Sequence, residues 1–390
     1  MVKQDQIHGR IEFSDAEMKL ITSKSFERLR YIKQLGFVEL VYPGASHNRY
    51  QHSLGTCQCV TDMYQAIVKN CPDFYREGDL ELVRMMALVH DLGHSPFSHA
   101  SEILSDITHE QRLAEILELE KDNIILAHNY DCESWELVNQ VYVGDGLIYL
   151  QDPHLMTLHS LMDGFVDADK IDYLERDSIN CGVGYGKFDR AALISNLTII
   201  KDKNGAEQIA LLDSGVQALE SFILARYYMF SQVYLHPMER IYRHQFCEEM
   251  QNLLVDGKYP DDIKKFLDLD DSRYIRKLKF LQKSKYELIY DAEFNAEIKA
   301  KVDRRLGKLL ICDTPRKSVF RQDTDDNTIM IVNSLTGQIV PCAEASPILS
   351  GIEYASVHKL RYYAETNKAK EVKSELYKIL KVGGKEYADY

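Results

Sequence analysis

The chain has 390 residues, of which 45% are apolar and 27% are charged, so it is long enough to bury a sizeable core. Its formal net charge of −13 excludes a generally basic surface and does not favour duplex nucleic acid as a partner. No apolar run reaches the length of a bilayer span, so we expect no membrane segment.

The N-terminus and the cysteines are typical of an intracellular protein. The first ten residues, MVKQDQIHGR, hold no apolar segment of the kind that a secretory signal needs. The eight cysteines are scattered, and their closest pair, Cys57 and Cys59, has neither disulfide-framework nor zinc-ribbon spacing. We therefore expect reduced cysteines and a cytoplasmic location.

Helical periodicity dominates the chain up to about residue 270, and the whole sequence has only nine prolines. The pattern predicts helices over residues 24–35, 51–69, 79–92, 109–120, 132–142, 155–178, 212–254 and 260–269. Thr108 and Gln111 form a capping-box pattern at the start of the helix at 109–120. Gly93 is expected to end the helix at 79–92.

Other segments favour strands. Residues 196–211 and 328–341 each carry β-branched runs around a turn with glycine, which predicts two hairpins. The tail from about 285 to 385 mixes helix and strand, and the polar stretch 312–327 predicts a loop. We therefore expect a mainly α protein with a helical catalytic core over residues 1–285 and a small C-terminal α+β lobe over residues 286–390.

The segment ALVHDLGHSPFSHA places titratable groups where a core is expected. Apolar residues surround His90 on nearly all sides of its helix, which indicates that the helix is buried. An unpaired buried carboxylate would be very costly, so Asp91 needs a partner there. A divalent cation would satisfy both His90 and Asp91, and it would be favoured at the negative end of the helix dipole.

Two other predicted helices offer further ligands. His52 lies near the start of the helix at 51–69, and Asp169 lies on the helix at 155–178. Tyr173 and Asp177 share a face with Asp169, since they follow it at i+4 and i+8. The sequence therefore predicts a metal site made of His52, His90, Asp91 and Asp169. Two imidazoles and two carboxylates suit Mn, Fe, Co, Ni, Zn or Mg, with positions left open for substrate oxygen and water.

The alternative is that these histidines are ordinary core residues with satisfied hydrogen bonds. Clustering favours the metal site, because six of the thirteen histidines fall between residues 47 and 109: His47, His52, His90, His94, His99 and His109. Core packing stays open for any single one of them.

Groups suited to proton transfer and anion binding surround the predicted site. His94, His99 and His109 are candidates for proton transfer, and Glu110 beside His109 could orient an imidazole. The alternative for each of the three histidines is a hydrogen-bonding role behind the metal ligands. Candidate anion contacts are Arg49, Lys170 and Arg176. For Arg176, a surface pair with Asp172 at i,i+4 is the favoured interpretation.

Five motifs in order along the chain resemble one family. They are ERLRYIKQLG, YPGASHNRYQHSLG, HDLGHSPFSHA, THEQ and DADKIDYLERD, and they cover about residues 15–250. They resemble the HD-domain metal-dependent phosphohydrolases, and within these the deoxynucleoside triphosphate triphosphohydrolases, which include bacterial enzymes and the animal enzyme with a sterile-alpha-motif and an HD domain. The resemblance implies an HD-domain helical core that hydrolyses a dNTP to deoxynucleoside and inorganic triphosphate with a divalent metal such as manganese.

The resemblance also implies roles for the matching residues. His109 would act as general acid to the departing 5′ oxygen, supported by Glu110 and His94. The substrate contacts would be Arg49 and His99 on the phosphates, Lys170 on the distal phosphate, Gln34 and Leu35 at the deoxyribose, Tyr173 against the sugar, Asp177 on the 3′-hydroxyl, and Tyr242 near the base. A 2′-hydroxyl would clash with Tyr173 in this arrangement.

Some positions depart from the family pattern. Family members often carry an aspartate where this chain has Glu102, a longer acid that could still orient a histidine. The animal enzyme is activated by a guanine nucleotide bound between subunits. Of the positions that match its base-reading residues, Arg30 is retained while Thr22 and Glu27 differ, which puts GTP activation in the same form in doubt.

Two other functions stay open at this point. One is an HD phosphohydrolase that acts on another nucleotide or on single-stranded nucleic acid, and the other is a nucleotide-sensing binding protein. An intact His109 argues against a pure binder, because binding needs no proton donor, and the acidic composition argues against nucleic acid. By the resemblance we expect a dNTP substrate and a homo-oligomer, dimer or tetramer, with a nucleotide activator left open.

Overall fold

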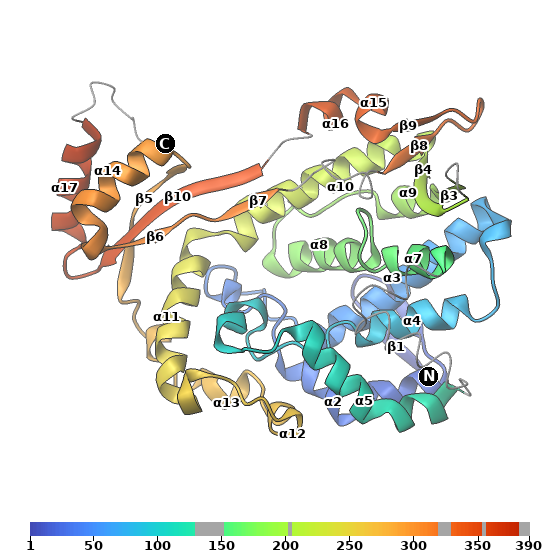
Figure 1. The fold of residues 1–390 in the computed structure, drawn as a ribbon, viewed down its shortest axis with the longest axis horizontal. Coiled ribbons are helices and arrows are strands. Elements are labelled where there is room, and N and C mark those ends of the chain that lie inside the picture. The colour runs from blue at the N-terminus through green and yellow to red at the C-terminus, as the bar shows by residue number, and fades with distance from the viewer. Residues whose placement is uncertain (129–151, 202–204, 319–328, 353–355, 382–390) are drawn as a thin grey trace.

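The computed structural model describes residues 1–128, 152–201, 205–318, 329–352 and 356–381 (Figure 1). This part of the chain is mainly helical with small sheets, as the sequence predicts. None of its helices has both the length and the apolar character needed to cross a bilayer. The predicted helix at 132–142 lies outside the described residues.

The chain begins with a hairpin of β1 (Val2–Asp5) and β2 (Gly9–Glu12), followed by α1 (Asp15–Ile21). The predicted helix at 24–35 is wrong in its second half. Helix α2 (Lys24–Glu27) tightens into a 3₁₀ turn over Arg28–Tyr31, and Ile32 is extended. Buried Arg28 anchors this turn, because its guanidinium donates to the backbone carbonyls of Leu269 and His94.

Three predicted helices of the core are confirmed. They are α3 (Arg49–Asn70), α4 (Asp79–Val89) and α5 (His109–His128). The capping box is also confirmed, since Thr108 and Gln111 exchange backbone-to-side-chain hydrogen bonds. Gly93 has a different role from the expected one, because α4 ends at Val89. A Cβ on Gly93 would stand 2.8 Å from the backbone nitrogen of Leu113, so this glycine lets α5 pack closely.

The predicted helix at 155–178 is two helices, α7 (Pro153–Ser160) and α8 (Ala168–Cys181). The sequence between them explains the break. Asp167 caps α8 by accepting from the backbone N–H of Lys170, and its other carboxylate oxygen accepts from the backbone N–H of Gly164. The capping aspartate therefore starts a new helix, and Asp169 lies in its first turn.

The predicted helix at 212–254 is also interrupted. After α9 (Arg190–Ser195), α10 (Val216–Met229) runs into a π-helical turn over Phe230–Tyr234, and α11 (Pro237–Leu253) starts afresh. Pro237 has no N–H to donate and so favours the first turn of a helix. The predicted helix at 260–269 is reduced to α12 (Ile263–Phe266), which α13 (Ser272–Ile275) follows. Further 3₁₀ turns span Val38–Leu40, Pro72–Phe74, Ser98–Leu104, Asp213–Gly215, Val255–Gly257, Lys279–Leu281 and Gly307–Leu309.

Both predicted hairpins are confirmed, and they join in one sheet. β3 (Leu197–Lys201) pairs with β4 (Glu207–Leu212), and β8 (Met330–Val332) pairs with β9 (Ile339–Pro341), each pair antiparallel. β8 lies parallel to β4, with Ala210 opposite Met330. The short helices α15 (Cys342–Ala345) and α16 (Pro347–Ile352) follow. Figure 1 shows that this later segment lies beside α10, away from the rest of the C-terminal region.

The C-terminal α+β lobe is confirmed as a structural feature at one end of the molecule (Figure 1). Strand β10 (Ser356–Glu365) pairs antiparallel with β5 (Tyr286–Glu293), β6 (Leu310–Asp313) and β7 (Arg316–Ser318). Helices α14 (Ala296–Leu306) and α17 (Ala369–Lys381) pack against this sheet through residues such as Val302 and Leu376. The predicted loop at 312–327 contains part of β6 and all of β7, and its remainder from 319 lies outside the described residues. A domain boundary at 285 stays a prediction.

The core lies where α3, α4, α8 and α10 pack against one another. Their buried side chains include Val60, Leu88, Ile171 and Phe222. A second, aromatic cluster holds Phe37, Phe97, Phe246 and Phe280 beside α11. This packing brings the start of α3, the end of α4 and the start of α8 together, and these three places carry the predicted metal ligands.

Candidate active site

A group of two histidines and one aspartate lies where the three core helices meet. Ligand atoms of His52, His90 and Asp169 all lie within 4.8 Å of one another. Nε2 of His52 is 2.8 Å from Oδ1 of Asp169 and 3.4 Å from Nε2 of His90. Three of the four predicted ligands are therefore close enough to share one cation.

Each imidazole is turned toward this group by a bond from its other nitrogen. Nδ1 of His90 donates to the backbone carbonyl of Ala87 at 2.7 Å, which leaves Nε2 facing the group. Nδ1 of His52 donates to Oδ2 of Asp172 at 2.7 Å. A carboxylate or carbonyl behind a histidine is the usual arrangement for a metal ligand, because it fixes the tautomer and the ring orientation.

Asp91, the fourth predicted ligand, lies beside the group and is buried. Its Oδ1 accepts from Arg49 Nη1 at 2.6 Å and lies 3.2 Å from His94 Nε2. Its Oδ2 is buried without a hydrogen-bond partner among the described residues and is 3.8 Å from His52 Nε2. An orphaned buried carboxylate oxygen facing imidazoles is what a bound cation would satisfy.

The pKa shifts agree with a site built for positive charge. Burial opposes ionisation of Asp91, but Arg49 and the neighbouring histidines outweigh it and hold the pKa of this carboxyl well below its usual range. Burial lowers the pKa of His52, yet its hydrogen bonds to Asp169 and Asp172 raise it to about 10. Two carboxylates thus favour a positive charge at the position of His52. The donor set of two imidazoles and two carboxylates fits Mn, Fe, Co, Ni, Zn or Mg.

Three more histidines form a row beside Asp91. The rings of His94 and His109 stack with centroids 4.4 Å apart, and the ring of His99 meets His94 edge-on at 4.9 Å. Nε2 of His109 is 3.0 Å from Oε1 of Glu110. Burial lowers the pKa of His109 below its ordinary value and that of His94 further still. The predicted proton-transfer residues His94, His109 and Glu110 therefore lie together.

Glu102 does orient a histidine, although it is longer than the family's aspartate. Its Oε1 accepts from His99 Nδ1 at 2.6 Å and lies 3.8 Å from His109 Nδ1. The hydrogen bond from His99 lowers the pKa of Glu102. The backbone before His99 is unusual, since Phe97 and Ser98 have φ angles of 63° and 54°. Non-glycine residues rarely adopt this region, and such strain often occurs at functional sites.

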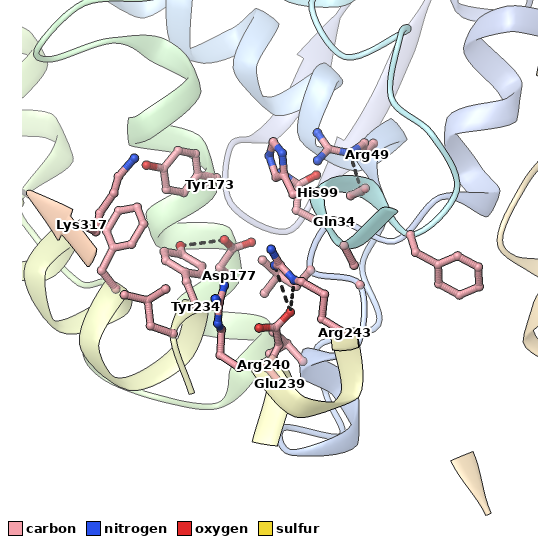
Figure 2. A pocket seen from close by; sticks show the side chains of 18 residues that line it. Gln34, Arg49, His99, Tyr173, Asp177, Tyr234, Glu239, Arg240, Arg243 and Lys317 are labelled. Atoms are coloured by element: carbon pink, nitrogen blue, oxygen red, sulfur yellow. Dashed lines mark hydrogen bonds and ion pairs between the residues drawn. The ribbon is translucent and has the colours of Figure 1, made fainter. Parts of the chain in front are cut away.

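A cavity of about 440 Å³ opens beside these histidines (Figure 2). Six of the predicted substrate contacts line it: Gln34, Leu35, Arg49, His99, Tyr173 and Asp177. Arg49 joins the cavity to the metal-ligand group, because it lines the cavity and also donates to Asp91. Further lining residues, which the sequence did not single out, include Phe230, Tyr234, Glu239, Arg243 and Lys317.

Asp177 and Tyr173 stand on one face of α8, as their spacing predicts. Asp177 is 1% exposed, and its two oxygens accept from Nε2 of His47 at 2.7 Å and from the hydroxyl of Tyr234 at 2.8 Å. The rings of Tyr173 and Tyr234 lie 6.1 Å apart, nearly perpendicular. In Figure 2, Asp177 and Tyr173 both face the hollow.

Two predicted contacts do not line the cavity. Nζ of Lys170 donates to the backbone carbonyl of Gly164 at 3.0 Å and forms an ion pair with Asp167. Tyr242 stacks on Phe280, with ring centroids 5.9 Å apart, against the aromatic cluster. Their substrate roles stay predictions.

Sequence reasoning missed a buried network behind His52. Asp172 accepts Nε and Nη2 of Arg176 at 2.8 and 2.9 Å, and it accepts Nε2 of His8 at 2.7 Å. Arg176 also donates to Asp5 of the N-terminal hairpin at 2.9 and 3.2 Å. The expected i,i+4 pair of Asp172 and Arg176 is present, but it is fully buried instead of lying on the helix surface. The i,i+4 spacing of Asp172 and Arg176 was the signal for this pair in the sequence. Nothing in the sequence indicated that His8 contacts Asp172.

Comparisons with known protein families agree with this geometry. Residues 49–151 match the HD domain, and residues 188–305 match the HD-associated region. The chain is an HD-domain protein. The HD domain includes α3, α4 and their histidines. HD domains occur in metal-dependent phosphohydrolases.

The relatives share this domain. The chain is 34% identical over 274 residues to an uncharacterized protein of Methanocaldococcus jannaschii, covering 69% of this chain and 53% of that protein. It is 31% identical over 284 residues to the deoxynucleoside triphosphate triphosphohydrolase SAMHD1 homolog of Dictyostelium discoideum, with the same two coverages. The chain thus spans about half the length of the curated relatives it matches. A crystal structure of a hypothetical protein from Aquifex aeolicus matches with a TM-score of 0.82 and 29% identity, covering 96% of this chain and 100% of that one.

Proposed function

We propose that this protein hydrolyses dNTPs to deoxynucleoside and inorganic triphosphate. The observation that carries the proposal is the position of the cavity. Tyr173 and Asp177 line it, and Arg49 connects it to the group of His52, His90 and Asp169. A cavity with an aromatic ring and a carboxylate in its lining therefore adjoins a set of metal ligands. The likeness to the Dictyostelium triphosphohydrolase supports the same substrate class.

His52, His90, Asp91 and Asp169 would hold a divalent cation, with manganese as one of the metals that suit the donors. Such a cation supplies Lewis-acid stabilisation of a phosphoryl oxygen and lowers the pKa of water. Arg49 contributes a fixed positive charge where Asp91 meets the cavity, so it can hold a phosphate oxygen there.

His109 is the residue we assign as general acid to the leaving 5′ oxygen. Its pKa is lowered by burial in the free protein. The negative charge of a bound triphosphate would raise that pKa, so protonation of His109 would accompany substrate binding. Glu110, 3.0 Å from Nε2 of His109, and His94, stacked on its ring, support the imidazole from two sides.

Tyr173 and Asp177 are the residues we assign to the sugar. A carboxylate has about four acceptor positions, so Asp177 can accept a 3′-hydroxyl in addition to its bonds from His47 and Tyr234. The ring of Tyr173 packs edge-on against Tyr234, and this contact limits its movement away from a 2′-hydroxyl. Gln34, Leu35 and His99 complete the lining. A homo-oligomer belongs to the same proposal by family likeness, and a cytoplasmic location belongs to it by the cysteine pattern and the N-terminal sequence. Activation by a nucleotide is tested by the mixtures with GTP and a second dNTP.

Product analysis tests the proposal. The manganese-loaded protein is incubated with each dNTP, with and without GTP and a second dNTP, and the products are separated by anion exchange. Deoxynucleoside with intact triphosphate is the expected result. A His109→Ala variant should lose this activity. His244→Ala, a control on the exposed surface of α11, should keep it. Monophosphate with pyrophosphate would indicate another phosphohydrolase reaction. Absence of turnover in every mixture would favour a nucleotide-sensing protein.

A further inference from the structure

Asp271 stands immediately before the short helix α13 but does not cap it. An aspartate at this position normally accepts a hydrogen bond from the backbone of its own helix. The side chain of Asp271 makes no such bond, and the preceding Asp270 accepts from the backbone N–H of Arg273 instead. Asp271 is only 4% exposed, so its carboxylate is turned into the protein. Both of its oxygens are therefore available to partners outside α13.

Those partners are two backbone N–H groups from distant parts of the chain. Oδ1 of Asp271 accepts from the amide of Phe97 at 2.6 Å, and Oδ2 accepts from the amide of Lys33 at 3.0 Å. Burial raises the pKa of Asp271 to about 6, although both hydrogen bonds and the charges of Lys33 and Arg28 lower it. The other titratable groups near this carboxyl are Tyr259 and Asp270.

The two amides belong to segments that form part of the cavity wall. Five residues of these segments line the cavity: Gln34, Leu35, Phe97, Ser98 and His99. The hydroxyl of Ser98 also donates to the backbone carbonyl of Lys33 at 2.7 Å, and it accepts from Nε of Arg49 at 2.7 Å. The carboxylate of Asp271 and the hydroxyl of Ser98 therefore join the two segments at two points.

The second segment has a conformation that needs such support. Phe97 and Ser98 have φ angles of 63° and 54°, a region that is costly for residues other than glycine. A hydrogen bond to an ionised carboxylate is stronger than one to a neutral acceptor, so Asp271 can hold the Phe97 amide in place. Asp271 lies in the HD-associated region, whereas Phe97 lies in the HD domain. One region thus fixes the backbone that leads into His99 of the other.

We propose that Asp271 is a positioning residue, which clamps these two segments together and thereby sets the positions of Gln34 and His99 in the cavity. The inference deepens the proposed function and rests on it for the identity of the substrate. Asp271 is not among the residues that line the cavity, and its side-chain hydrogen bonds within the described part of the chain go to the two amides. It therefore acts on a substrate only through the backbone that it holds.

The test combines amide hydrogen exchange with dNTP turnover of the manganese-loaded full chain. Asp271→Asn keeps the shape of the side chain but has one acceptor oxygen, so it can hold only one of the two amides. Asp271→Ala holds neither. We expect kcat/KM to fall about tenfold in Asp271→Asn and about 100-fold in Asp271→Ala, because a shift of about 1 Å in a positioned group has an effect of this order. The amides of Lys33 and Phe97 should exchange faster in both variants.

Asp270→Asn is the matched control. It removes one carboxylate from the adjacent, partly exposed residue, and asparagine can still accept from the amide of Arg273. Its kcat/KM and its exchange at Lys33 and Phe97 should equal those of the native protein. Metal affinity should be unchanged in all four proteins, which also shows that the variants are folded.

The pH dependence adds a readout that a merely structural role would not change. Once protonated, the carboxyl presents an O–H to one of the two amides and can no longer accept from both. The clamp is therefore complete above about pH 6 and is lost as the pH falls through that value. The ratio of kcat/KM between the native protein and Asp271→Asn should accordingly fall toward one as the pH is lowered.

Failure of the clamp and failure of the proposed function are distinguishable. Native exchange at Lys33 and Phe97 in Asp271→Ala would overturn the clamp, whether or not the protein hydrolyses dNTPs. Faster exchange with unchanged kcat/KM, or a ratio that stays constant with pH, would overturn the positioning role. If the native protein releases no triphosphate from any dNTP, the proposed function fails, and hydrogen exchange alone decides whether Asp271 holds the two segments.

Discussion

The Gly55→Ala substitution tests the buried network behind His52. Gly55 lies in α3, within one turn of His52. A Cβ on Gly55 would stand 2.9 Å from Cγ of Asp172 and closer still to Nη2 of Arg176. These side chains cannot give way easily, because both are fully buried and Arg176 is also bonded to Asp5. The methyl group would therefore force the Asp172–Arg176 pair apart or push Asp172 away from His52.

The expected cost follows from these contacts. Replacing glycine by alanine inside a helix normally stabilises a protein by about 1 kcal/mol. Here overpacking costs about 1–3 kcal/mol, and breaking a buried ion pair costs about 3–5 kcal/mol. We expect a net destabilisation of about 2 kcal/mol or more. Because Asp172 orients the ring of His52, metal affinity should fall about 10- to 100-fold.

The assays are urea unfolding of the metal-free protein and titration of metal into the folded protein. Gly351→Ala is the matched control, since Gly351 lies in helix α16 and a Cβ there would meet nothing within 4 Å. The control should be neutral or slightly stabilising and should bind metal as the native protein does. If Gly55→Ala were as stable as Gly351→Ala and bound metal equally well, the account of the network would be wrong.

Three further predictions concern catalysis, selectivity and pH. His109→Ala should lower kcat about 10²- to 10⁴-fold in a steady-state assay and leave metal affinity unchanged; an equal loss of metal binding would contradict its role as proton donor. Tyr173→Ala should narrow the preference for dNTPs over NTPs, measured as the ratio of kcat/KM values, and an unchanged ratio would remove Tyr173 from sugar selection. His154 lies between the carboxylates of Asp79 and Glu207, each 2.8 Å from a ring nitrogen. Burial lowers the pKa of His154, but these bonds outweigh it and raise the pKa above 6.5. Its stabilising contribution should thus be complete below about pH 6.5 and disappear as the pH rises through the raised value. Urea unfolding should therefore show a difference in unfolding free energy between the native protein and His154→Gln that becomes smaller as the pH rises. A difference that grows with pH would refute this role of His154.

Much of the site could be predicted from the sequence, because its residues lie at fixed spacings on regular helices. Asp169, Tyr173 and Asp177 follow one another at i, i+4 and i+8 on α8, so they share a face however the helix packs. His90 and Asp91 follow an apolar helix, and a carboxylate buried at that end needs a positively charged partner. These local patterns needed no knowledge of distant contacts.

The parts that could not be predicted depend on contacts between distant segments. His8 reaches Asp172 across 164 residues of sequence, and the side chain of Arg28 donates to the carbonyl of Leu269, 241 residues further along the chain. Two helix breaks do have local signals: a capping aspartate before Ala168, and Pro237 itself. The helical periodicity around them was given more weight, and it predicted continuous helices. Lys317 reaches the cavity from the lobe, which no periodicity in its own segment indicates.

Hydrolysis in ¹⁸O-labelled water tests the central claim most directly. The native, metal-loaded protein is incubated with its best dNTP, and the products are analysed by mass spectrometry. Attack of water on the α-phosphorus breaks the bond to the 5′ oxygen, so one ¹⁸O atom should appear in the inorganic triphosphate and none in the deoxynucleoside. Label in the deoxynucleoside, or release of labelled monophosphate or orthophosphate in place of triphosphate, would contradict the proposed reaction.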